Sequence, residues 1–225
     1  MKLNFSLVEQ SLKHVEAFLK PVTQQKLIEL KEREKVISWT SRKPGIYNEV
    51  YYPIEYQCVI DARQYSLLLK DGSFFQFFYE FDVKTSELKK AKLAFYPSPV
   101  DSRNSLDDLN EAAESAFEYN EELYNHLDNW IELLEIKKYF PANTSQVRFD
   151  YDGGVTTHEK AHLQFSSVNK LRLPADFFPL PYAFVLMVSE LINGCSKVDA
   201  KHMSFTKRHG LKSTISNRII SLKSQ

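Results

Sequence analysis

The chain opens with apolar residues at helical spacing. Between residues 7 and 19 they recur every three or four positions, which places them on one face of a helix. Ser6, followed three residues later by Glu9, is typical of a capping box, and Pro21 ends the helix. Similar spacing from Thr23 to about residue 40, with the charged run KEREK as its solvent side, predicts a second helix.

Residues 56–100 change to a strand pattern. The runs YQCVIDA, QYSLLLK, SFFQFFYEFDV and AKLAFYPSPV are rich in β-branched and aromatic residues. The pair Asp71-Gly72 between two of them predicts a hairpin, and KTSEL supplies the next turn. Just before them, SRKPGIYNEVYYP contains Pro44 and Pro53 and is typical of a loop or an edge segment. We expect an antiparallel meander.

A long acidic helix is predicted next, from residue 105 to residue 139. Ser105 serves as its N-cap with Asp108 at the third helical position. Its apolar stripe consists of Leu109, Phe117, Leu123, Leu127, Ile131 and Leu134. Eleven Asp or Glu and one Arg occur in residues 101–135, so the outer face is acidic. We expect this helix to pack on one side of the sheet.

The C-terminal third returns to strands. QVRFDYD and KAHLQFSS flank a Gly153-Gly154 turn region, and KLRLPA predicts a further strand. FFPLPYAFVLMVSELINGC predicts a short buried helix that ends at Gly194. The expected fold is α+β: an antiparallel sheet of five to seven strands with these helices. It forms one domain over residues 1–195, with a helical N-terminal segment to about residue 40, followed by a basic tail, 196–225.

Composition narrows the class of protein only moderately. The formal net charge is zero, so no global electrostatic argument favours nucleic acid or a membrane. Two distant cysteines, Cys58 and Cys195, exclude a disulfide framework and fit a reducing cytoplasm. The charged N-terminus is unlike a signal peptide, and no apolar run is long enough to span a bilayer. Walker A, Rossmann, GxSxG and kinase motifs are missing from the sequence.

Strand alternation gathers the candidate chemistry on one sheet face. Arg148 and Asp150 share a side of their strand, and His162 and Gln164 share a side of the next. Guanidinium, carboxylate and imidazole groups together can hold a phosphate and move a proton, which is all that a metal-free RNA-cleaving site needs. The alternative is structural: Arg148 pairs with Asp150, and His162 is a satisfied polar residue at a seam.

Two further motifs have both a functional and a structural interpretation. HEKAH, with His158, Glu159 and His162, spells a zinc-protease pentad, but it runs into the strand-like HLQF, so we expect neither a metal nor a cofactor. FYPSPVD ends a strand abruptly between two prolines. It is either a rigid exit from the sheet or a segment whose Tyr96 or Ser98 lines one pocket with His162.

The order FYPSP, RFDYD, H…HLQF, RLP and a proline before an apolar helix resembles a prokaryotic domain-of-unknown-function family, number 2290. The resemblance covers about residues 67–193 and implies a bacterial, cytosolic protein without an established activity. The layout is also similar to that of TumE-type toxins, from DGS and a tyrosine-rich strand to a histidine-bearing strand. That similarity would place Arg148 and His162 in an RNA-directed site.

We therefore expect a cytoplasmic bacterial toxin or antiviral-defence protein that acts on nucleic acid, as a metal-independent ribonuclease. The alternative is a non-catalytic subunit or antitoxin-like protein that binds a partner. The partners expected are nucleic acid and a protein from the same operon, and no membrane. The expected roles are catalysis by His162, His158 and Asp150, phosphate binding by Arg148 and Arg172, and support from Tyr96 and Gln164.

Overall fold

The computed structural model divides the chain into two compact units, 1–97 with 145–225 and 98–144. The described residues are 3–43, 52–99, 106–118, 120–122, 124–125, 128, 131–132, 145–156, 159–165, 171–192, 194 and 209–210. The expected domain of residues 1–195 spans both units. Of the expected basic tail, only residues 209–210 lie within the described part.

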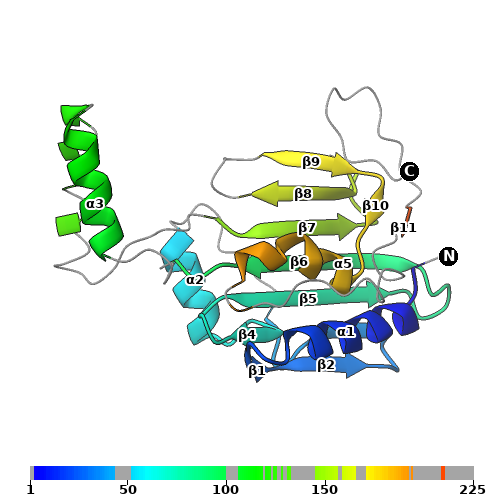
Figure 1. The fold of residues 1–225 in the computed structure, drawn as a ribbon. Helices are drawn as coiled ribbons and strands as arrows, with labels where there is room; N and C mark the ends of the chain where they lie inside the picture. Colours follow the sequence, from blue (N-terminus) through cyan, green and yellow to red (C-terminus); the bar gives the residue numbers. More distant parts are fainter. Residues whose placement is uncertain are drawn as a thin grey trace. The chain divides into compact units, whose positions relative to one another are not determined.

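The larger unit is built on a nine-stranded sheet in which every pair of neighbouring strands is antiparallel. Its main path runs β1-β4-β5-β6-β7-β8-β9, and the β2-β3 hairpin joins it through β5 (Figure 1). The strands are β1 Thr23–Lys26, β2 Ile28–Lys31, β3 Val36–Trp39, β4 Leu67–Leu69, β5 Phe74–Phe81, β6 Leu88–Tyr96, β7 Val147–Asp152, β8 Ala161–Phe165 and β9 Arg172–Ala175. A separate small sheet pairs β10 Phe177–Phe178 with β11 His209–Gly210.

The α+β class is confirmed, whereas the strand number exceeds the expected five to seven because residues 23–39 are not helical. KEREK overlaps a tight turn between β2 and β3, where Lys35 has a φ of 56°. β3 then hydrogen-bonds to β5, with Ile37 opposite Tyr79. This long-range pairing overrides the helical propensity of the charged run.

Helix α1, Phe5–Leu19, keeps its predicted apolar stripe buried. The predicted capping box is wrong: the N-cap is Asn4, whose Oδ1 accepts a hydrogen bond from the Leu7 amide at 2.9 Å. Asn4 precedes the first helical residue, where a side-chain oxygen reaches the free amides, whereas Ser6 already lies inside the first turn. The helix ends before Pro21, as predicted.

Helix α2, Tyr52–Asp61, replaces the strand predicted from YQCVIDA. Pro53 lies in its first turn, where a missing amide hydrogen costs no helical hydrogen bond. Tyr52 and Val59 are seven positions apart, lie on one helix face and are buried against β5 and β6. Residues 44–51, which include Pro44, lie outside the described residues.

The predicted hairpins around β5 are confirmed. Gly72, in the turn between β4 and β5, has a φ of 86°, a region that favours glycine, and Asp71 Oδ1 accepts from both the amide and the hydroxyl of Ser73. Residues 82–87 form the turn to β6, and β7, β8 and β9 follow as expected.

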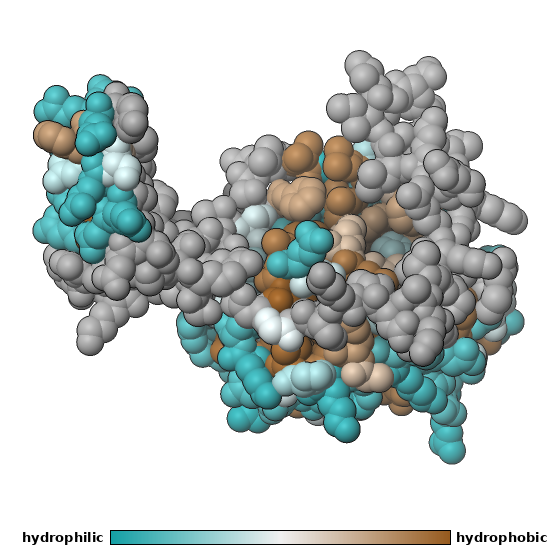
Figure 2. Space-filling view, viewed as in Figure 1, coloured by the Kyte–Doolittle hydropathy of each residue, from teal (hydrophilic) through white to brown (hydrophobic). Residues whose placement is uncertain are grey.

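Helix α5, Pro181–Val188, continues into a 3-10 turn, Ser189–Leu191, and lies with α1 over one face of the sheet (Figure 1). The helix and the 3-10 turn both end before Gly194, where the sequence predicted the end of this helix. Tyr182 and Phe184 are buried, but Met187 is 51% exposed, so the helix is not apolar core on every side. Apolar side chains are visible over α5 in the surface view from this side (Figure 2).

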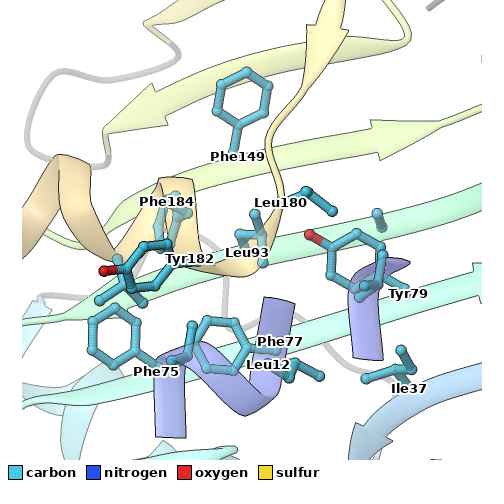
Figure 3. Close-up of a cluster of buried hydrophobic side chains, with 14 of the residues drawn as sticks. Leu12, Ile37, Phe75, Phe77, Tyr79, Leu93, Phe149, Leu180, Tyr182 and Phe184 are labelled. Carbon is cyan, nitrogen blue, oxygen red and sulfur yellow. The ribbon is translucent and has the colours of Figure 1, made fainter. Parts of the chain in front are cut away.

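The main core lies between this helical layer and the sheet. Phe75, Phe77 and Tyr79 project from β5, and Leu93 and Phe149 from β6 and β7 (Figure 3). They meet Leu12 of α1 and the α5 aromatics. The Tyr79 hydroxyl donates to the Pro179 carbonyl at 2.9 Å, so this buried polar atom is satisfied.

In the smaller unit, α3, Leu106–Phe117, is helical where predicted but is followed by a turn at Glu118, and helical residues recur from 121 to 132. The predicted cap Ser105 lies outside the described residues. Phe117 was expected in the apolar stripe, yet it is 63% exposed and packs edge-on against Tyr124 instead. Packing of this acidic segment on the sheet stays a prediction.

Candidate functional site

The second face of the sheet carries a row of polar side chains across three neighbouring strands. Lys92 of β6 lies directly opposite Asp150 of β7, and Asp150 lies opposite His162 of β8. In the next row, Arg148 lies opposite Gln164. We call Lys92, Arg148, Asp150, His162 and Gln164 the polar face. Their alternate neighbours, among them Leu93, Phe149 and Leu163, point into the main core.

Arg148 and Asp150 form the central ion pair. The Nε and Nη2 atoms of Arg148 both lie 2.7 Å from Oδ2 of Asp150. Arg148 is buried and Asp150 half-buried. Burial disfavours the charge on the guanidinium, but Asp150, Tyr96 and Glu55 outweigh it and raise the pKa of Arg148. Arg148 is therefore a fixed positive charge below the surface.

His162 lies beside this ion pair. Its Nε2 is 3.2 Å from Oε1 of Gln164 and 3.8 Å from Oδ2 of Asp150. The side chain is 6% exposed, and burial lowers the pKa of His162 below its ordinary value of 6.5, against the attraction of Asp150. The imidazole is thus held neutral near pH 7 and can accept a proton. The Asp150 carboxylate then stabilises the resulting cation.

Lys92 is the most strongly perturbed cation of the polar face. Burial and the nearby Arg148 charge lower its pKa to about 8, although Asp150 and Glu55 oppose this shift. The residue as a whole is half-buried by exposed area. A lysine with this pKa exchanges its proton close to physiological pH.

Glu55 reaches the same region from α2. Its Oε1 accepts a hydrogen bond from the Tyr96 hydroxyl at 3.0 Å, and the residue is 7% exposed. Burial raises the pKa of Glu55 from its ordinary value of 4.5, although Tyr96, Lys92 and Arg148 oppose the shift. Tyr96 itself stacks on Phe74, with ring centroids 4.5 Å apart.

The raised pKa of Glu55 leads to a pH prediction. Folding favours its protonated form, so wild-type stability is lost as the pH rises from the unfolded pKa through the folded one. Replacing Glu55 by glutamine removes this loss, since the amide oxygen can still accept from Tyr96. We expect the melting temperature of Glu55→Gln to change more favourably from about pH 4 to about pH 7 than the melting temperature of the wild type. Thermal melts at the two pH values measure this difference. An identical pH dependence for both proteins would contradict it. The control is Glu29→Gln on β2, where the glutamate side chain is 40% exposed.

Arg42 and Gln76 border the polar face on the side of β5. The guanidinium carbon of Arg42 lies 3.8 Å from the ring centroid of Phe78, which is the cross-strand neighbour of Lys92. Among the described residues, the buried Nε of Arg42 has no hydrogen-bond partner, and neither has Oε1 of Gln76, a residue only 4% exposed. Gln76 Nε2 donates to the Gln64 carbonyl at 2.6 Å, which orients the amide.

The structure places some of the predicted site residues together and others apart. The structure brings Arg148, Asp150, His162 and Gln164 together, and Tyr96 joins them through Glu55. Arg172 lies opposite Gln164 at the end of the same row and is exposed. His158 lies outside the described residues. Ser98 belongs to the smaller unit.

The described part of HEKAH, residues 159–162, is not helical. His162 is in β8, and Glu159 and Lys160 precede that strand without helical structure. A helical zinc site requires the whole pentad within one helix, and these four residues do not form one. Within the described ranges, no group of three or more His, Cys, Asp or Glu is placed to hold a metal ion.

Sequence reasoning missed Lys92, Glu55, Arg42 and Gln76. Lys92 is one of three lysines in KKAKLAFY, and its even spacing from Tyr96 was a usable signal for a shared face. Glu55 was hidden by the wrong strand prediction for α2. Arg42 and Gln76 carry no sequence motif and reach the site only through the pairing of β3, β4 and β5.

Comparisons place the chain in a family without revealing an activity. Among the described residues, no helix has the length and apolar character needed to cross a membrane. No curated protein matches the chain, and neither does any solved structure. One family model, described as an uncharacterized conserved protein, matches residues 22–216. Because the match covers most of the sequence and both strands of the predicted site, the chain belongs to the DUF2290 family.

Proposed function

We propose that this protein acts on nucleic acid as a metal-independent ribonuclease and that the polar face is its active site. The observation that carries the proposal is the position of His162 beside Asp150 and Arg148 on adjacent strands. These residues combine a group that can exchange a proton near neutral pH with a buried positive charge. The biological class, a toxin or antiviral-defence protein, is proposed from the TumE-like layout of the sequence.

The proposed reaction needs only groups that the site and the RNA supply. The ribose 2′-oxygen attacks the phosphorus, its proton passes to His162, and the bond from phosphorus to the 5′-oxygen breaks. The leaving 5′-oxygen takes a proton from solvent water, and the imidazolium of His162 returns its proton to solvent, so the products are a 2′,3′-cyclic phosphate and a 5′-hydroxyl and the protein is unchanged. Asp150 stabilises the imidazolium that forms, and Arg148 favours the charge that builds up on the phosphoryl oxygens.

A non-catalytic, partner-binding function is the second candidate. It is favoured by the burial of Arg148 and His162, which are 9% and 6% exposed. Their polar atoms already contact Asp150 and Gln164, so the network could serve only to hold β7 against β8. In that case their substitution changes stability and leaves no chemical signature.

The test is cleavage of single-stranded RNA by the purified full chain in the presence of a chelator. We expect cyclic phosphate and 5′-hydroxyl ends, and no cleavage of the matching 2′-deoxy strand. Replacing His162 by glutamine should lower the cleavage rate at least roughly 100-fold, because it removes the proton acceptor. Product ends are read by mass spectrometry, and thermal melts report whether the variant is folded.

The control is Lys90→Met, on the same face of β6 as Lys92 but 49% exposed and paired with Asp152. It should cleave at the wild-type rate. RNA left intact by the wild-type protein would overturn the proposed ribonuclease. Equal rates for wild type and folded His162→Gln would overturn the assigned site and favour the partner-binding function.

A further inference from the structure

We propose that Arg42 and Lys92 bind a phosphate group of the ligand beside the ring of Phe78. This inference rests on the proposed function and deepens it, because it assigns phosphate binding to two residues that the sequence did not single out. The ligand class is a phosphodiester or phosphate monoester, with nucleic acid as the source favoured by the proposed chemistry.

Arg42 is held rigidly in place. The Gln64 side chain accepts from Trp39 Nε1 at 3.2 Å and from the Lys43 amide at 2.7 Å, and its Nε2 donates to the Ser41 carbonyl at 3.2 Å. These bonds fix the backbone on both sides of Arg42, and the guanidinium lies over Phe78. A cation positioned in this way loses little conformational entropy when it binds an anion.

Lys92 lies next to this guanidinium, because it is the cross-strand neighbour of Phe78. The Arg42 charge contributes to the lowered pKa of Lys92, which indicates that the two cations repel each other. No ion pair joins either of them to another described residue. A bound anion would relieve this repulsion.

The three carboxylates whose charge acts on Arg42 or Lys92 are engaged elsewhere. Asp150 binds Arg148, the Glu80 carboxylate binds Lys89 at 2.6 Å, and Glu55 accepts from Tyr96. Within the part of the chain that the structure describes, the buried Nε of Arg42 is left without an acceptor. Because a buried donor without an acceptor is costly, this edge of the polar face is suited to a ligand that brings oxygen acceptors and negative charge.

Arg148 is less suited to the same task. Its Nε and Nη2 atoms are both used by Asp150, which leaves Arg148 fewer donors for a ligand. Arg42 and Lys92 therefore supply positive charge that is not paired with a carboxylate of the described residues. Lys92 and His162 are two strands apart, a backbone separation of roughly 10 Å, with Asp150 on the strand between them.

The test measures binding to a short 2′-O-methyl RNA, which the proposed reaction cannot cleave because the attacking hydroxyl is blocked. We expect Lys92→Met and Arg42→Met each to weaken binding by roughly tenfold, the loss of one charge-assisted hydrogen bond. Each should also reduce the slope of log affinity against log salt by about 0.7. Fluorescence anisotropy over a salt series with the full chain gives both quantities.

Lys90→Met is the matched control and should keep the wild-type affinity and slope. Lys92→Arg should keep the slope, which distinguishes loss of charge from local misfolding. Wild-type affinity in both methionine variants would overturn the inference, as would binding of neither RNA nor inorganic phosphate by the wild type. Phosphorus NMR measures the binding of inorganic phosphate. If the protein binds phosphate through Lys92 but does not bind RNA, the result supports the anion site and overturns nucleic acid as the source. Binding of the blocked RNA without cleavage of ordinary RNA supports the inference and overturns the ribonuclease.

Discussion

Replacing Phe75 by alanine should lower the free energy of unfolding by about 4 kcal/mol, because it opens a cavity in the main core. Phe75 is 0% exposed and contacts the rings of Phe77, Phe95 and Phe184. It therefore joins β5 to β6 and to α5 at one point. Chemical denaturation followed by circular dichroism measures the change.

Val83→Ala is the control for this prediction. Val83 lies in the turn between β5 and β6 and is 60% exposed, so its truncation should cost less than about 0.5 kcal/mol. A similar cost at both positions would mean that Phe75 is not a core residue and would contradict the arrangement of the sheet under α5.

Replacing Arg148 by methionine should lower the free energy of unfolding by about 3 kcal/mol, since it leaves Asp150 without its counter-charge in a partly buried site. The Asp150 side chain is 21% exposed, so water can only partly compensate for the lost guanidinium. The same measurement applies, at neutral pH and moderate salt.

A second substitution shows whether the loss comes from the stranded carboxylate. In the Arg148→Met/Asp150→Leu double variant both charges are gone, and stability should recover most of the loss. Lys90→Met breaks an exposed ion pair with Asp152 and should cost less than about 1 kcal/mol. A double variant as unstable as Arg148→Met alone would show that Arg148 acts through its packing and not through its charge.

Local patterns were enough for the centre of the sheet. The strands from β4 to β9 were predicted because apolar and polar residues alternate in them and strong turn signals separate them, such as Asp71-Gly72. The secondary structure predicted for two segments was wrong. Residues 23–39 have apolar spacing that fits either a helix or a hairpin, and α2 contains the aromatic and β-branched residues that are typical of strands. In both, contacts with β5 and β6 decided the outcome.

By itself, the sequence determined which side chains share a strand face, because the two-residue period of a strand is a local property. Arg148 with Asp150 and His162 with Gln164 follow from that period alone. Only the tertiary structure decided what surrounds them. The register of β6 places Lys92 opposite Asp150. The turn at residues 40–41 brings Arg42 over the ring of Phe78, and α2 places Glu55 beside Tyr96. These contacts join residues 58, 36 and 41 positions apart, and burial then shifts the pKa values of Lys92 and Glu55, so no local pattern could encode them.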